Sequence, residues 1–179
     1  MSFENPAGST QASTDRYVQS LLELLGQRDP LVTMPELPRA VEKLVTGLDD
    51  TQLRRPEKLG KWCVIEVVQH LADTEIVYGY RVRKTLAAPG TTIAGYDQDA
   101  WARTLRYGTV DLEIALQQLR VLRTANLRLL GSLSPAEWER AGMHSERGLE
   151  SVRQVSRLVA GHDFVHLNQI ARIKRAIGA

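Results

Sequence analysis

The chain has 179 residues, 43% of them hydrophobic and 25% charged, which is the composition of a globular domain and excludes a disordered or fibrous chain. Its net charge of +2, with Lys and Arg dispersed along the sequence, argues against nucleic acid as a ligand. A single cysteine, no signal-peptide pattern and no apolar run of about 18 to 20 residues lead us to expect a cytoplasmic protein with no membrane partner.

The N-terminal region divides into a polar segment and a helix. Residues 1–14 are mostly small and polar, so we expect a flexible segment there and a single domain over residues 15–179. Apolar residues from Tyr17 to Leu25 follow helical spacing and predict a helix that ends near Gly26.

The stretch "TMPELPRAVEKLVTGL" predicts a second helix. Thr33 and Glu36 have the spacing of a capping box, in which each side chain bonds a free amide at the helix start. Pro38 leaves the first residue of this helix open, because proline is tolerated only within the first turn. The apolar face continues to Leu48.

The longest helical pattern of the first half begins after "KW" and stops at Pro89. Cys63 is the expected N-cap, with Glu66 at the third helical position, although cysteine is a weaker cap than serine. Residues 90–109 show no sustained periodicity and are expected to form a long connection, which in compact domains is often functional.

The second half contains two further long helices. One is expected from about Val110 to Leu130, and another opens at Ser151; Ser134 begins a short helix between them. No segment alternates with period two for long enough to predict a strand. The predicted class is therefore all-α, a four-helix bundle with long crossover connections.

The last helix carries two histidines on its apolar stripe. His162 and His166 are four residues apart, so their rings lie about 40° apart around the axis and about 6 Å apart along it. Each buried imidazole without a partner costs about 1 to 3 kcal/mol. Separate hydrogen bonds within the core would satisfy them, and so would one metal ion bound by both.

A third metal ligand would have to come from upstream. Residues 167–179 contain no His, Asp, Glu or Cys, which argues against the H-E-x-x-H class of zinc proteases that "HDFVH" partly matches. His70 lies well inside a predicted helix and is the favoured candidate on geometry. His144, Asp73 and Glu66 remain alternatives.

Four motifs in order, "GKWCVIEVVQHLADTE", "YDQDAWA", "LRTANLRLL" and "AGHDFVHLNQI", resemble the DinB-like superfamily of metal-binding four-helix bundles. The resemblance implies that His70, His162 and His166 bind a divalent metal, with zinc, nickel or iron as candidates. It also implies an up-down-down-up bundle and a homodimer. Cys63 departs from the family pattern, which usually has Ser or Thr after "KW".

Functionally, the resemblance implies an enzyme that acts on a small electrophilic molecule, either a thiol S-transferase using a low-molecular-weight thiol or a hydrolase. Three neutral imidazoles would leave an ion an open position, as catalytic sites do. Asp163, Asp73 and Asn126 are candidates to orient the imidazoles or an incoming water. For Asp163, which points about 100° from His162, a solvated surface role is an equal alternative.

Two other functions remain open. The chain could be a metal-binding stress or accessory protein without turnover, or a metal-free helical interaction module. An open coordination position that faces a pocket would favour catalysis, and a shell closed by protein would favour the structural role. Tyr96, Asp97 and Trp101 in the long connection are candidates to cover such a pocket.

Overall fold

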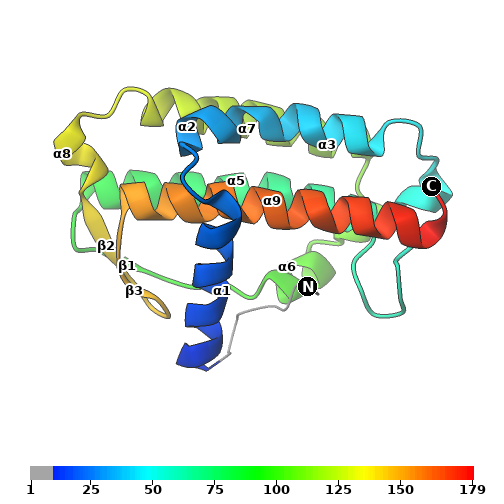
Figure 1. The fold of residues 1–179 in the computed structure, drawn as a ribbon, viewed down its shortest axis with the longest axis horizontal. Helices are drawn as coiled ribbons and strands as arrows, with labels where there is room; N and C mark the ends of the chain where they lie inside the picture. The colour runs from blue at the N-terminus through cyan, green and yellow to red at the C-terminus, as the bar shows by residue number, and fades with distance from the viewer. Residues whose placement is uncertain (1–9) are drawn as a thin grey trace.

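Four helices form the body of the molecule. A computed structural model describes residues 10–179, and the helices of its bundle are α3 (Leu37–Val45), α5 (Val64–Ala87), α7 (Leu112–Leu130) and α9 (Val152–Ile177). Figure 1 shows that α5 and α7 run in one direction and that α3 and α9 run in the other. The all-α class and the up-down-down-up bundle are therefore confirmed.

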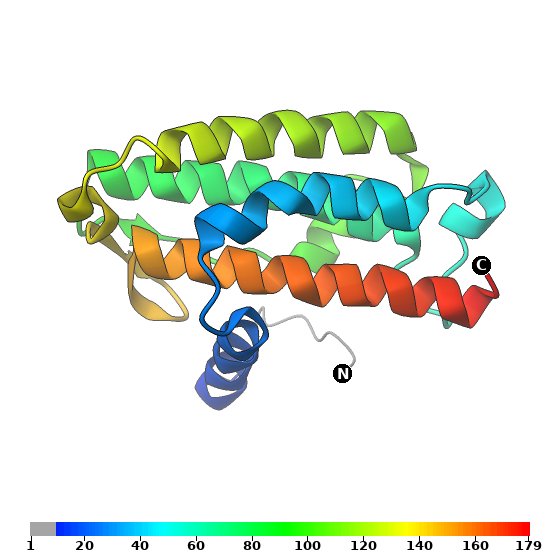
Figure 2. The ribbon, with the colours of Figure 1, turned by 45° about the horizontal axis from the view of Figure 1, so that its top comes forward.

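Residues 1–9 of the expected flexible segment lie outside the described residues, and α1 (Gln11–Leu25) begins within the remainder of that segment. Gly26, at a φ of 62°, ends this helix as expected. In Figure 2 α1 projects away from the bundle. It crosses α9 at Gly161, where any Cβ would overlap the carbonyl oxygen of Leu21.

The helix starts follow the capping residues of the sequence. Ser151 Oγ accepts a hydrogen bond from the backbone N–H of Gln154 at 3.1 Å, and Ser134 forms a capping box with Glu137 at the start of α8 (Pro135–Trp138). Glu66 accepts from the backbone N–H of Cys63 at 2.8 Å, which fixes the start of α5. These three predicted caps are confirmed.

The expected capping box of Thr33 and Glu36 is wrong. The chain turns earlier, at Asp29, whose carboxylate accepts from the N–H of Leu31 at 2.8 Å and opens α2 (Pro30–Thr33). Proline is preferred at the first helical position, where its missing N–H is no loss, and Pro30 occupies it. A 3₁₀ turn, η1 (Met34–Glu36), then joins α2 to α3, and the short α4 (Asp50–Leu53) follows α3.

The expectation of no strands is also wrong. Three short strands form a sheet of order β1-β2-β3: β1 (Thr92–Ile93) pairs in parallel with β2 (Ala141–His144), which pairs antiparallel with β3 (Gly148–Ser151). Strands of two to four residues are too short to show an alternating pattern. The connection at 90–109, expected to lack regular structure, contains β1, α6 (Gln98–Thr104) and η2 (Tyr107–Thr109).

Two apolar clusters fill the bundle. The larger one lies where α3, α5, α7 and α9 meet and includes Cys63, which is 4% exposed. Burial raises the pKa of this thiol to about 11, so Cys63 is a packed residue and not a thiolate at neutral pH. Within residues 10–179, no helix has the length and apolarity to cross a bilayer.

Candidate metal centre

Three imidazole rings converge inside the bundle. His70 comes from α5, and His162 and His166 lie one turn apart on α9. Nε2 of His162 is 3.1 Å from Nε2 of His70 and 3.0 Å from Nε2 of His166. One ligand nitrogen from each ring lies within 4.8 Å of the others, so the chain brings together the three histidines that the resemblance singled out.

These distances fit one small cation. Two nitrogens at about 2.0 to 2.1 Å from a metal are separated by about 2.9 Å at a right angle and about 3.4 Å at the tetrahedral angle. The observed separations of 3.0 and 3.1 Å fall inside that interval. These two separations therefore suit a divalent metal, and the third pair of nitrogens lies within 4.8 Å.

The positions of the imidazole protons also favour a bound cation. Nδ1 of His166 is 2.7 Å from Oε1 of Gln169, which is an acceptor, so Nδ1 carries the proton and the Nε2 lone pair faces the cluster. His162 has one proton when neutral and cannot donate to both neighbours through Nε2. Its Nδ1 has no hydrogen-bond partner within residues 10–179. Lone pairs left facing one another at about 3 Å are what a bound cation satisfies.

Burial keeps the imidazoles neutral. It lowers the pKa of His166 to about 4, and it lowers those of His70 and His162 well below their usual value, with the neighbouring rings adding to the effect. A metal binds the neutral ring, so the site is in its binding form at pH 7.

The cluster has one open side. His70 is 1% exposed and His166 is 0% exposed, whereas His162 lines a pocket of about 110 Å³ between α1, α5, the β2-β3 hairpin and α9. Tyr96 lines the same pocket. Trp101 instead packs against the Tyr96 ring at 4.7 Å, and Asp97 caps α6, so of the three expected covering residues only Tyr96 lines the pocket.

The alternative third ligands lie elsewhere. Glu66 serves the helix cap, and His144 sits in β2, where its Nδ1 accepts from the backbone N–H of Glu146 at 3.2 Å. Both carboxylate oxygens of Asp73 are used: Oδ2 accepts from Tyr107 at 2.6 Å, and Oδ1 accepts from the amides of Gln69 and Gln118, each at 2.9 Å. Asp73 therefore anchors the long connection to α5.

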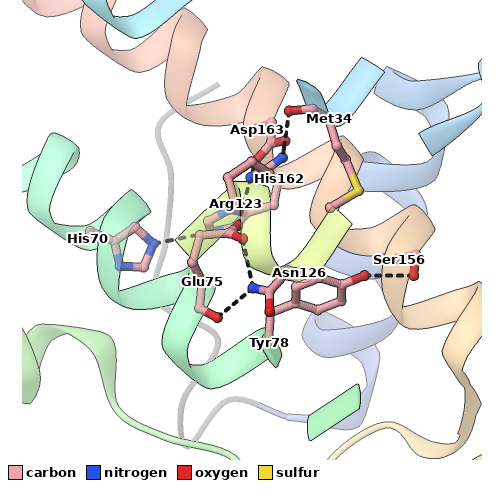
Figure 3. Close-up of polar contacts among 9 residues, drawn as sticks. All are labelled: Met34, His70, Glu75, Tyr78, Arg123, Asn126, Ser156, His162 and Asp163. Carbon is pink, nitrogen blue, oxygen red and sulfur yellow. Dashed lines mark hydrogen bonds and ion pairs between the residues drawn. The ribbon is translucent and has the colours of Figure 1, made fainter. Parts of the chain in front are cut away.

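Asp163 and Asn126 belong to a second polar cluster, the Arg123 cluster, made of Glu75, Arg123, Asn126 and Asp163 (Figure 3). Arg123 is 1% exposed and binds both oxygens of Asp163 at 2.7 and 3.0 Å. Nη2 of Arg123 also lies 2.8 Å from Oε1 of Glu75. The other carboxylate oxygen of Glu75, Oε2, accepts a hydrogen bond from Nδ2 of Asn126 at 2.9 Å. Although burial opposes its charge, the two carboxylates raise the pKa of Arg123.

The expected solvated position of Asp163 is therefore wrong, because its side chain is buried in this ion pair. Within residues 10–179, no hydrogen bond is found between an imidazole of the triad and Asp163, Asp73 or Asn126. The group that does orient an imidazole is Gln169, which the sequence analysis did not single out. Its position three residues after His166 on the same helix face was the available signal.

The fold and this cluster define a class: helical bundles with a candidate divalent-metal site built by three histidines from two helices. The family model described as the DinB superfamily matches residues 35–170, and the chain belongs to this family.

The chain is similar to proteins named "Putative metal-dependent hydrolase". One from Oceanobacillus iheyensis is 30% identical over a match that covers 77% of this chain and 80% of the relative. One from Geobacillus thermodenitrificans is 30% identical over a match that covers 75% of this chain and 72% of the relative. Among solved structures, YfiT from Bacillus subtilis, described as "a probable metal-dependent hydrolase with an unusual four-helix bundle topology", matches with a TM-score of 0.75. It is 24% identical, and the match covers 98% of this chain and 94% of that one.

Proposed function

We propose that the protein is a divalent-metal-dependent enzyme that hydrolyses a small electrophilic molecule or transfers a low-molecular-weight thiol to it, with His70, His162 and His166 as the metal ligands. The observation that carries this proposal is that His162 lines a pocket while the other two rings are buried. A ligand shell with one open side is the arrangement of catalytic metal sites.

When bound, a divalent ion at three neutral imidazoles supplies Lewis acidity that lowers the pKa of a water or a thiol. The residues of this chain prepare that chemistry. Gln169 holds the tautomer of His166, and apolar side chains of α1, α5 and α9 form part of the pocket wall. The only cysteine, Cys63, is a packed thiol, so a transferred thiol would have to enter from solution.

The metal proposal is tested by elemental analysis of protein expressed without a histidine tag. We expect about one divalent ion per wild-type chain and a loss of most of it in His70→Ala. His144→Ala is the matched control, because it removes another buried histidine that lies outside the triad. Full metal content in His70→Ala would contradict the assignment of His70.

Turnover is tested on the metal-loaded protein with esters and amides in buffer, and then with electrophiles in the presence of small thiols. We expect activity that falls with the metal content of the variants. A protein that binds metal and stays silent in both screens would instead fit a metal-binding stress or accessory protein. The homodimer and the identity of the metal, whether zinc, nickel or iron, also remain proposals, checked by light scattering and by the same elemental analysis.

A further inference from the structure

The pocket beside His162 has an aliphatic wall and a polar end. The aliphatic wall is built by α1, α5 and α9 and consists of Val18, Leu21, Val77, Val155, Leu158 and Val159. The polar residues come from α5, the start of α6 and the β2-β3 hairpin, and they include Arg81, Gln98, His144 and Glu146. A ligand in this pocket can therefore meet an apolar surface and polar groups as well as His162.

Two buried nitrogen donors at the polar end are unused. His144 is 2% exposed, and because its Nδ1 accepts from the backbone of Glu146, its proton lies on Nε2. Within residues 10–179, neither this Nε2 nor Nε2 of Gln98, a side chain 6% exposed, has a hydrogen-bond partner. Buried donors without acceptors are rare in proteins, and two in one pocket indicate a ligand that brings the acceptor.

A positive charge stands beside these donors. Arg81 donates to the carbonyl oxygen of Ala94 at 2.8 Å, but within the described chain no carboxylate lies at ion-pair distance from it. The other guanidinium of the lining, Arg147, already binds Glu150 through two contacts of 2.6 and 2.8 Å. Burial, with Arg147 nearby, lowers the pKa of Arg81, and the carboxylates of Glu150 and Glu146 oppose this only in part because neither forms an ion pair with Arg81 in the described residues.

We propose that this pocket binds small aliphatic carboxylates, with the carboxylate at Arg81, His144 and Gln98, the chain along the aliphatic wall and the reacting carbon at the His162 end. A carboxylate is the acceptor that both uses two N–H donors and balances a guanidinium. Glu146 is the one carboxylate of the lining, and it disfavours an anion there. The reaction at His162 rests on the proposed function, whereas the binding of the carboxylate does not.

The test is the binding of hexanoate, hexanamide and hexylammonium by calorimetry to protein treated with a chelator, so that no metal attracts the carboxylate. We expect hexanoate to bind about tenfold more tightly than hexanamide, because the amide lacks the negative charge and has an NH2 donor in place of one acceptor oxygen, and hexylammonium to bind weakest. Equal affinities for hexanoate and hexanamide, or tighter binding of hexylammonium, would overturn the proposal.

Three variants sharpen the result. Arg81→Met should remove the preference for hexanoate, and Glu146→Gln should increase it several-fold, so the two substitutions shift affinity in opposite directions. Lys84→Met removes a positive charge from the same helix at a residue outside the lining and should leave the preference unchanged. A hexanoate preference that survives Arg81→Met in a folded protein, or that Glu146→Gln lowers, would overturn the assignment.

The two proposals fail separately. If chelated protein prefers hexanoate but the metal-loaded protein turns over no ester or thiol substrate, the proposed function is wrong and the carboxylate site stands. If metal-loaded protein hydrolyses neutral esters as well as carboxylate-terminated ones and the chelated protein shows no preference, the enzyme stands and the carboxylate site is wrong.

Discussion

Two buried polar clusters meet on α9, where His162 belongs to the imidazole cluster and the next residue, Asp163, belongs to the Arg123 cluster. The two clusters differ in how their polar groups are satisfied. In the Arg123 cluster the guanidinium meets two carboxylates, and Asn126 completes the hydrogen bonds of Glu75. In the imidazole cluster the three rings face one another at about 3 Å, and Nδ1 of His162 lacks a partner in the described residues. Every charge of the first cluster has a counter-charge, although Nε of Arg123 has no hydrogen-bond partner in the described residues, whereas the second cluster offers three ring nitrogens that a cation would satisfy.

The largest expected effect comes from breaking the Arg123 cluster. Arg123→Met would leave Glu75 and Asp163 buried without their counter-charge, which costs about 3 to 5 kcal/mol of unfolding free energy. Urea denaturation of the wild type and of Arg123→Met at pH 7 measures this difference in unfolding free energy. Arg120→Met, which breaks exposed pairs with Glu42 and Glu113, is the control and should cost less than about 1 kcal/mol. Similar small losses in both variants would show that the Arg123 cluster is not a stabilising core element.

The next effect is a pH dependence of stability. Burial lowers the pKa of His166 to about 4, against about 6.5 in an unfolded chain, so the unfolded state binds more protons between these values. His166 should therefore lower the unfolding free energy of metal-free protein by about 1.6 kcal/mol between pH 6.5 and 5. Burial raises the pKa of Asp163 to about 6, which gives a dependence of opposite sign, so the wild type is compared with His166→Leu by denaturation in the presence of a chelator. Equal pH dependences in the two proteins would contradict the burial of a neutral His166.

The last expected effect concerns the hydrogen bond between Gln169 and His166 in the imidazole cluster. Gln169→Leu removes the acceptor of His166 Nδ1 and should weaken metal binding about tenfold to a hundredfold, as loss of such a bond does in other metal sites. Gln169→Glu keeps an acceptor at that place and should retain most of the affinity. Competition with a metallochromic chelator measures both. Equal affinities in the Leu and Glu variants would show that Gln169 has no positioning role.

The sequence predicts well what is local or periodic. Ser134 and Ser151 identify helix starts because a cap and its partner lie three residues apart, and His162 and His166 reveal a shared face through their spacing. His70 was favoured as their partner because it lies well inside a predicted helix, and the resemblance singled it out from His144, Asp73 and Glu66, since nothing in local spacing relates residues 92 positions apart.

Features that depend on distant partners were beyond prediction. The strands are too short to show a period, and β1 pairs with a strand that follows it by about fifty residues. Asp163 was misplaced because its burial depends on Arg123, a charged residue on another helix, and charged side chains are almost never fully buried unless paired.

The parallel direction of α5 and α7 has a consequence for how this architecture can diversify. Two parallel neighbours require a return path about as long as the helices, and this chain uses that path, residues 88–111, to carry Tyr96 and Gln98 to the pocket. The same path is not part of the bundle interior that holds the three histidines. Under the proposed function, substitutions along this path would change which molecule enters while the helices that carry the three histidines keep their sequence, so the choice of substrate and the binding of metal would evolve on separate stretches of one chain.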